Sequence, residues 1–176
     1  MEDEMDLKSK IRVIEDFPKE GISFKDITTV LKDSDDFHDM IDQVIDRLEG
    51  YEFDYIVGVE ARGFILGAPV AYAMDKGFVP VRKPGKLPSK TLSEKYALEY
   101  GEAEVEMHED AFEKGARVVI LDDLLATGGT VEATVKLIEK TGAEVVAIGF
   151  LAELTGLNGR EKLNGKDVFS LVTWEY

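Results

Sequence analysis

The sequence contains no cysteine and only two histidines among its 176 residues. The lack of cysteine excludes a disulfide framework, a zinc–thiolate site and a cysteine nucleophile. His38 and His108 are far apart in the sequence, and two acidic residues directly follow His108. Scattered histidines of this kind are typical of solvated side chains, and they make a poor case for a metal site.

Long hydrophobic runs are missing as well. The longest uncharged apolar run, residues 63–74, is shorter than the roughly 20 residues that a membrane-spanning helix needs. Residues 1–4 are acidic and lack the basic and then apolar layout of a signal peptide. An apolar content of 44% and a charged content of 32% are typical of a folded globular protein. We therefore expect one domain over residues 1–176, in the cytoplasm, with no membrane partner.

Basic residues are scarce, because 21 Lys and Arg stand against 36 Asp and Glu, for a net charge of −15. Such an acidic chain disfavours nucleic acid as a partner. Residues 82–95 are the exception, with five basic residues and one acid. The basic residues are Arg82, Lys83, Lys86, Lys90 and Lys95. A concentrated positive loop on an acidic body predicts a local phosphate site.

Prolines and a glycine keep the basic segment, residues 82–95, from forming a helix or a central strand. A loop of this length in a compact domain is typically a lid or a binding loop, and a plain solvent loop is the alternative. Residues 96–100 and 102–107 alternate in period two around Gly101, which predicts a hairpin that closes this loop.

The apolar run Val118-Val119-Ile120-Leu121 predicts a strand that is buried on both faces. Two carboxylates follow, then a glycine-rich turn, and then a helical pattern from about Thr130 to Lys140. In open α/β sheets ligands bind at the carboxyl ends of the strands. A glycine-bearing turn before a helix offers N–H groups to an anion, whereas carboxylates suit hydroxyl groups or a metal. This segment therefore predicts a sugar phosphate site, with an ordinary strand–turn–helix corner as the alternative.

The rest of the chain alternates between strand and helix patterns, which predicts an α/β fold with a mostly parallel central sheet and helices on both faces. Ser34 and Gly50 are expected to cap and stop the clearest helix, and Pro69 to kink a helix or begin its second piece. The expected helices are residues 6–16, 35–48 and 65–74. The expected strands are residues 55–59, 77–81, 143–151 and 168–172, with a loop at 153–159.

Two residues outside the central motif have a functional and a structural interpretation. Arg62 follows the strand 55–59, where it could pair with Glu60 or clamp a phosphate with its forked guanidinium. Phe24 could be a core residue or a stacking platform for a flat ligand.

Residues 119–130, Val-Ile-Leu-Asp-Asp-Leu-Leu-Ala-Thr-Gly-Gly-Thr, resemble the phosphoribosyl pyrophosphate (PRPP) signature of the type I phosphoribosyltransferases. Further segments resemble the adenine phosphoribosyltransferase family in particular, so that the resemblance runs from about residue 11 to residue 171. These segments are residues 17–26, 60–64, 82–88 and 98–101.

The resemblance implies the type I phosphoribosyltransferase fold, with an N-terminal hood over residues 1–30 and a flexible closing loop over residues 82–101. It implies a purine-salvage transferase that moves the phosphoribosyl group of PRPP to adenine, giving AMP and pyrophosphate. Mg²⁺ would be the cofactor, held mainly by PRPP and water with no direct protein ligand. A homodimer is also implied.

The resemblance further implies a role for each matching residue. The residues implied to cradle the 5-phosphate are Ala126, Thr127, Gly128, Gly129 and Thr130, beside Asp122 and Asp123 at the ribose hydroxyls. Those implied to hold pyrophosphate are Arg62, Arg82, Lys83 and Lys86. Those implied to bind adenine are Ser23, Phe24, Lys25 and Leu154. The implied catalytic residues are Glu99 and Arg62, with Tyr100 on the closing loop.

Two other functions stay open at this point. The same chemistry could act on a 6-oxopurine such as hypoxanthine, guanine or xanthine, whose oxo group calls for a donor. Ser23 and Lys25 depart from the residues associated with other family members at this turn, which weakens the base assignment slightly. A non-catalytic regulator that senses PRPP or purines is the other alternative, but the chain lacks a basic face and a DNA-binding motif.

Overall fold

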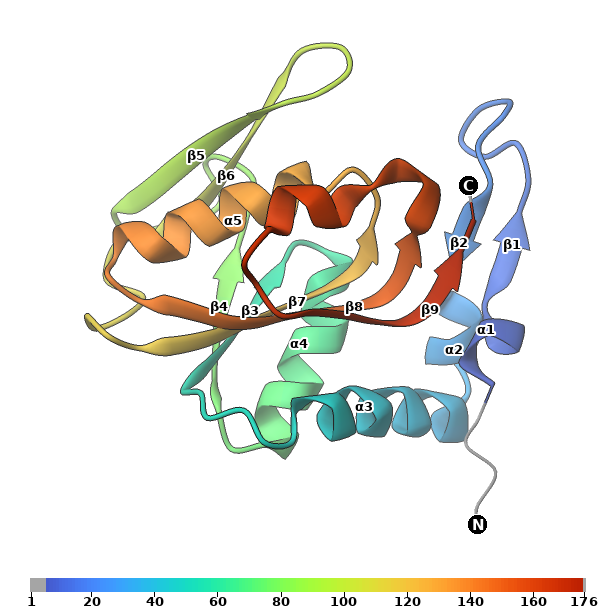
Figure 1. The fold of residues 1–176 in the computed structure, drawn as a ribbon, viewed down its shortest axis with the longest axis horizontal. Coiled ribbons are helices and arrows are strands. Elements are labelled where there is room, and N and C mark those ends of the chain that lie inside the picture. Colours follow the sequence, from blue (N-terminus) through green and yellow to red (C-terminus); the bar gives the residue numbers. More distant parts are fainter. Residues whose placement is uncertain (1–5, 176) are drawn as a thin grey trace.

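The computed structural model describes residues 6–175 and contains a central sheet of five strands, all parallel, in the order β4-β3-β7-β8-β9. The strands are β3 (Tyr55–Val59), β4 (Gly77–Val81), β7 (Arg117–Leu125), β8 (Glu144–Leu154) and β9 (Val168–Trp174). The expected parallel α/β sheet is confirmed. It places β7, which the glycine-rich turn follows, in the middle of the sheet (Figure 1).

Helices cover both faces of the sheet. The helices α3 (Ser34–Leu48) and α4 (Arg62–Ala73) lie on one face, and α5 (Gly129–Lys140) lies on the other (Figure 1). Two short 3-10 helices, η1 (Thr155–Leu157) and η2 (Gly159–Leu163), lie on the α5 side. Val119 and Leu121 pack toward α3 and α4, whereas Val118 and Ile120 pack toward α5. This alternation confirms that β7 is buried on both faces.

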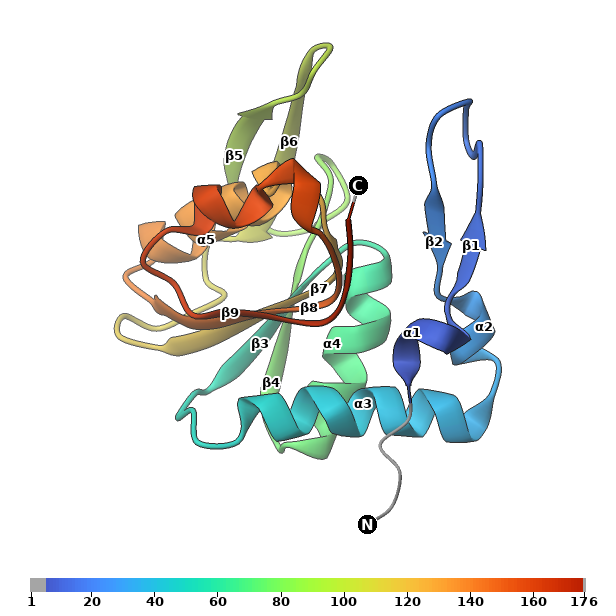
Figure 2. The same ribbon diagram turned by 45° about the vertical axis from the view of Figure 1, so that its right-hand side comes forward.

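Two antiparallel hairpins rise beyond the carboxyl edge of the sheet, one on each side (Figures 1 and 2). One consists of β1 (Arg12–Ile14) and β2 (Phe24–Asp26), the other of β5 (Thr91–Ala97) and β6 (Glu102–His108). The short helices α1 (Leu7–Lys10) and α2 (Thr28–Leu31) flank the first hairpin. The space between the hairpins lies above the ends of the central strands.

The helix expected over residues 6–16 is wrong beyond its first turn. Leu7 and Ile11 are buried as their spacing suggested, but the backbone becomes extended at Ile11 and residues 12–14 form β1. Arg12 pairs with Asp26 of β2 both in the strand register and through its guanidinium. A tertiary pairing therefore overrides a short helical pattern here.

The helix expected over residues 35–48 is confirmed as α3, but its cap is not Ser34. The Asp33 carboxylate accepts hydrogen bonds from the N–H groups of Asp35 and Asp36 at 3.0 and 3.1 Å, and Ser34 is the first helical residue. Gly50 has a φ of +89° just beyond the helix, as its role as a stop requires. Pro69 lies inside a single helix, α4, which begins at Arg62, three residues before the expected start.

Three further expectations need correction at the carboxyl edge. Residues 91–95 belong to β5, so the basic loop is shorter than 82–95. Glu153 and Leu154 end β8 and are not in a loop. Asp122 and Asp123 lie within β7, which runs on to Leu125. β7 and β8 extend past their apolar runs because their ladder continues to the pair of Leu125 and Glu153.

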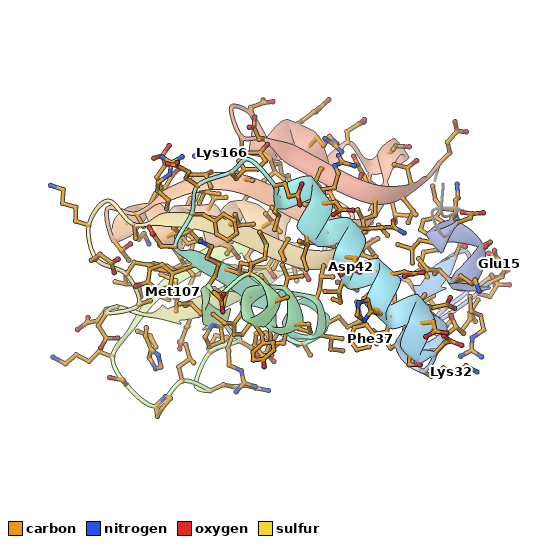
Figure 3. All side chains as sticks on the ribbon, turned by 90° about the horizontal axis from the view of Figure 1, so that it is seen from below. Glu15, Lys32, Phe37, Asp42, Met107 and Lys166 are labelled. Carbon is orange, nitrogen blue, oxygen red and sulfur yellow. The ribbon has the colours of Figure 1, made fainter. Side chains whose placement is uncertain are left out.

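The face that carries α3 and α4 also holds an open apolar hollow of about 360 Å³ between these helices. Figure 3 views this face from below and labels Phe37 and Asp42 of α3, which line the hollow with Pro69 and Ala73 of α4. No helix within residues 6–175 is long and apolar enough to cross a membrane.

Candidate active site

Three adjoining hollows meet at the carboxyl end of β7, and all three are lined by Leu124. The middle hollow, of about 450 Å³, contains Arg62, Asp122 and Asp123. A hollow of about 90 Å³ lies toward α5 and shares Asp122 and Thr130 with it. A hollow of about 100 Å³ lies toward the first hairpin and shares Arg62 and Asp123. Together they form a groove that crosses the carboxyl edge of the sheet.

The hollow toward α5 is a cradle of backbone groups. It is lined by residues 126–130, the whole glycine-rich turn. Gly128 has a φ of +84°, and a Cβ at this position would lie 2.6 Å from the carbonyl oxygen of Gly159 in η2. Both the left-handed backbone and this close approach require glycine. The free N–H groups at the start of α5 therefore face a fixed anion-sized space.

The two aspartates of β7 line the middle hollow with different partners. Asp122 accepts a hydrogen bond from the Asp123 N–H at 2.8 Å. Burial, and then the charge of the Asp123 carboxylate, raises the pKa of Asp122 well above its ordinary value. Asp123 forms an ion pair with Arg62. The aspartate pair therefore presents one carboxyl that keeps its proton readily and one that is paired with a guanidinium.

Arg62 does not pair with Glu60, as one interpretation of the sequence had it. Its guanidinium pairs with Asp123 and lies 5.8 Å from the centre of the Phe24 ring. Burial alone would lower the pKa of Arg62, but the Asp123 carboxylate raises it above its ordinary value, so the side chain stays charged. Arg62 thus stands at the junction between the middle hollow and the hollow beneath the first hairpin.

Glu60 instead holds the basic loop against the groove. Its carboxylate accepts the Lys83 N–H at 2.7 Å and pairs with Arg82 and Lys86 at 3.3 and 3.5 Å. Burial alone would raise the pKa of Glu60, but these three partners lower it below its ordinary value. Lys83 also lines the middle hollow, beside a further hollow of about 550 Å³ that Arg82 and Tyr96 line. The cations therefore converge here, and two of them, Arg82 and Lys86, are already paired with the Glu60 carboxylate.

The hollow beneath the first hairpin is mostly apolar, and Ser23, Phe24, Lys25 and Leu154 all line it. Phe24 packs edge-on against Phe17, with 5.2 Å between the ring centres. The Lys25 ammonium donates to the Ser23 hydroxyl at 2.6 Å and lies 5.2 Å from the centre of the Trp174 ring. The Lys25 ammonium, which a 6-oxopurine would need as a donor, is therefore already engaged by Ser23 and Trp174.

Glu99 and Tyr100 are not brought into the groove. They lie in the turn between β5 and β6, closed by a hydrogen bond from Leu98 N–H to the Gly101 carbonyl at 3.0 Å. Both side chains are exposed, Tyr100 to 87%, and neither lines any of the hollows described above. The expected strand over residues 96–100 therefore ends at Ala97.

Sequence reasoning missed three residues that surround the cradle. The Thr130 and Tyr96 hydroxyls are hydrogen-bonded at 3.0 Å, and a Cβ at Gly129 would lie 3.9 Å from the Lys162 ammonium. Gly159 approaches the cradle from η2. For Tyr96 a signal existed, because it occupies an inward position in the period-two pattern of β5. Neither Lys162 nor Gly159 carries a local motif.

Within residues 6–175 no group of three or more histidine, aspartate or glutamate side chains is arranged to hold a metal ion. The oxygen donors of the groove are instead the pair Asp122 and Asp123, together with Glu60 at its rim.

Comparison with known proteins gives a consistent result. A sequence model of the family described as phosphoribosyl transferase domain matches residues 23–176. An adenine phosphoribosyltransferase of Alkaliphilus metalliredigens is 62% identical over 170 residues, which cover 97% of this chain and 100% of that protein. The crystal structure of adenine phosphoribosyltransferase from Thermoanaerobacter pseudethanolicus superimposes with a TM-score of 0.94 at 57% identity, covering 96% of this chain and 98% of that one.

A second solved structure was determined with ligands. Adenine phosphoribosyltransferase from Saccharomyces cerevisiae, complexed with an imino-altritol bisphosphate and adenine, has a TM-score of 0.90 at 38% identity. The match covers 96% of this chain and 97% of the yeast chain.

Proposed function

Because this chain belongs to the adenine phosphoribosyltransferase family, we propose that it transfers the 5-phosphoribosyl group of PRPP to adenine, giving AMP and pyrophosphate. It is a transferase of purine salvage. The observation that carries the proposal is the order of the three hollows, which runs from an anion cradle through a carboxylate and guanidinium site to an apolar slot. A ribose phosphate flanked by a pyrophosphate and a flat base has the same order of chemical groups.

In the proposed complex the 5-phosphate accepts hydrogen bonds from the N–H groups of residues 126–130. Asp122 and Asp123 face the ribose hydroxyls, because carboxyl groups accept hydrogen bonds from a diol. Phe24 and Leu154 enclose the adenine ring, and the main chain at Ser23 and Lys25 reads its edge. The proposed pyrophosphate ligands are Arg62, Arg82, Lys83 and Lys86.

The proposed reaction has a ribosyl transition state of oxocarbenium character, in which negative charge grows on the departing pyrophosphate. Fixed cations near that position stabilise this charge more in the transition state than in the substrate. Arg62 and Lys83 line the hollow that would contain it. Before they can act on pyrophosphate, Arg62 must exchange Asp123, and Arg82 and Lys86 must exchange Glu60, for phosphate oxygens.

The proposal assigns proton transfer at the purine to Glu99, with Tyr100 beside it. Both residues lie on the exposed turn of the second hairpin, so the proposed closing loop, residues 82–101, must move toward the groove before Glu99 reaches a base. Closure would also exclude water, which strengthens the electrostatic interactions in the groove. Residues 1–30 are the proposed hood over the adenine end, although residues 1–5 lie outside the described part of the chain.

Mg²⁺ fits the groove as part of the proposal. Asp122 and Asp123 add hard oxygen atoms beside the position of the proposed diphosphate, and Mg²⁺ keeps several waters and binds mainly through substrate phosphates. We assign it no direct protein ligand. When bound with PRPP, the ion supplies charge neutralisation for the leaving pyrophosphate. A homodimer in the cytoplasm is also part of the proposal and rests on the family resemblance alone.

The experiment that tests the proposal is a turnover assay with PRPP, Mg²⁺ and each purine base. We expect adenine consumption with equal release of pyrophosphate and AMP. Preference for hypoxanthine, guanine or xanthine would overturn the assignment of the base. Binding of PRPP without turnover of any purine would support the non-catalytic regulator instead. Light scattering of the same sample tests the homodimer.

A further inference from the structure

Polar contacts join the second hairpin to α5 near both ends of this helix. Near the C-terminal end of α5, the Lys140 ammonium donates to the Ser93 carbonyl at 3.0 Å and pairs with Glu94 at 2.6 Å. At the N-terminal end of α5, Thr130 is hydrogen-bonded to Tyr96. Beyond Tyr96 the chain is exposed from Ala97 through Glu102. The hydrogen bond of Tyr96 is therefore the last of these contacts with α5 before the exposed turn that contains Glu99.

The Tyr96 ring packs against Gly129 at the start of α5, beside the glycine-rich turn. A Cβ at Gly129 would lie 3.1 Å from Cδ2 of the ring, so the aromatic edge packs on the first turn of α5. The Tyr96 hydroxyl lies 3.0 Å from the Thr130 hydroxyl. Thr130 in turn lines the cradle, the middle hollow and the large hollow of about 550 Å³. One hydroxyl thus touches both the hairpin and the proposed phosphate site.

The direction of this hydrogen bond has a consequence for ligand binding. The Thr130 and Tyr96 hydroxyls each have one proton, so either can donate in the hydrogen bond that joins them at 3.0 Å. A phosphate in the cradle is a stronger acceptor than a phenol, because it is charged. The Thr130 hydroxyl would then donate its hydrogen bond to the phosphate, and the Tyr96 hydroxyl would donate its own to the Thr130 oxygen. Such a chain of hydrogen bonds polarises each member and strengthens the last one.

We propose that Tyr96 is a positioning residue for the 5-phosphate, acting through the Thr130 hydroxyl and linking the occupied cradle to the hairpin that carries Glu99. This inference rests on the proposed function, because it assumes that a sugar phosphate occupies residues 126–130. The Tyr96 hydroxyl supports the charged phosphate through Thr130 and does not touch the reacting carbon.

The test is the variant Tyr96→Phe, which keeps the ring packing and removes only the hydroxyl. We expect the Kd for ribose 5-phosphate, measured by calorimetry, to rise about three- to tenfold, the effect of one hydrogen bond in a chain to a charged group. The KM for PRPP should rise by a similar factor, with kcat changed far less. The Kd for pyrophosphate alone should be unchanged. Equal weakening of pyrophosphate and ribose 5-phosphate would overturn the proposal.

A double-mutant cycle with Thr130→Val separates this role from a purely structural one. If Tyr96 acts through Thr130, Tyr96→Phe should add almost nothing to the loss of ribose 5-phosphate affinity in the Thr130→Val background. Full additivity would overturn the proposal, because it would mean that Tyr96 acts without Thr130.

Tyr55→Phe is the matched control. The Tyr55 hydroxyl donates to Glu113 at 2.9 Å near the amino end of β3, far from the cradle. This variant loses one tyrosine hydrogen bond as well, but it should bind ribose 5-phosphate like the unmodified protein. If it weakens binding as much as Tyr96→Phe does, the effect is general and the proposal fails. Failure of the unmodified protein to bind PRPP would instead overturn the proposed function.

Discussion

The two sides of the groove hold their charges in different ways. On the α5 side, residues 126–130 offer backbone N–H groups whose positions are fixed by the left-handed Gly128 and its contact with Gly159. On the opposite side the cations are long side chains, and Arg62, Arg82 and Lys86 are each paired with a carboxylate. The cradle is therefore formed before a ligand arrives. Under the proposed function, the cations must exchange their carboxylate partners for phosphate, and the hairpin tip must move toward the groove, so that binding and catalysis depend on different parts of the site.

The largest effect expected from this division is on Glu99. Glu99→Ala should lower kcat by about a hundredfold or more, because a positioned acid or base contributes about 10²–10⁴ to rate. PRPP affinity should change little, since the exposed tip does not form the cradle. Steady-state kinetics combined with calorimetry of PRPP checks this. Equal losses in kcat and in PRPP affinity would mean that Glu99 is part of the binding site, and binding and catalysis would then not depend on separate parts of the groove.

The next largest effect is expected in the cradle. Gly128→Ala should raise the Kd for ribose 5-phosphate by about tenfold or more, because it adds about 1–2 kcal/mol of backbone strain and a clash with the Gly159 carbonyl. Gly165→Ala is the matched control, since Gly165 has a φ of +82° but open space around its Cβ. It should lower the melting temperature without affecting binding. Equal binding losses in both variants would mean that backbone strain alone explains the effect.

A smaller effect tests whether the first hairpin is also preformed. Hydrogen bonds from the Thr28 hydroxyl and then from Arg12 lower the pKa of Asp26 from its ordinary 3.8 to about 2. Asp26 therefore stabilises the fold above about pH 4, and this stability is lost as the pH falls through about 2. Asp26→Asn should cost about 1–3 kcal/mol at neutral pH, measured by urea denaturation.

The control for Asp26 is Asp42→Asn, which removes only an exposed pair with His38 on α3. This variant should change stability by less than about 0.5 kcal/mol. If Asp26→Asn lowers stability no more than Asp42→Asn does, at neutral pH and in acid alike, then this carboxylate does not fix the first hairpin. The hairpin would then have to be grouped with the cationic side of the groove and not with the preformed cradle.

The smallest effect on ligand affinity is expected from Glu60, the carboxylate that is paired with Arg82 and Lys86 of the basic loop. Glu60→Gln should tighten pyrophosphate binding by about two- to threefold, because the ligand no longer displaces a carboxylate that is paired with Arg82 and Lys86. Glu144→Gln, which loses an exposed pair with Arg117, should leave it unchanged. Calorimetry at two salt concentrations measures both. Weaker pyrophosphate binding in Glu60→Gln would mean that Glu60 holds the cations in their binding positions already.

The central strands and the glycine-rich turn could be predicted from the sequence because their signals are local. Four apolar residues before Asp122 mark β7, and the spacing of apolar residues marks α3. The first hairpin could not be predicted, because β1 forms only through its pairing with β2, and Ile14 fits a helical pattern equally well. Asp33 was missed as a cap because Ser34, next to it, has the same preference.

The sequence motifs indicate many of the residues that line the groove, but not their contacts, and not the position of Glu99 outside it. These residues were identified from motifs. That Arg62 pairs with Asp123 and not with Glu60 depends on the path of the short turn between β3 and α4, which no motif indicates. Tyr96 lies 34 residues from Thr130 in the sequence, so no local pattern indicates their hydrogen bond. The distance of Glu99 from the groove depends on the orientation of a whole hairpin.

The all-parallel sheet also has a practical consequence for engineering this protein. Since every central strand ends at the same edge, the turns at the amino edge take no part in the proposed chemistry. Two of them contain Gly50 and Gly115, each with open space where a side chain would begin. Affinity tags, fluorophores or inserted peptides placed at these turns should leave turnover intact, which makes the amino edge the natural side for attaching the protein to a surface.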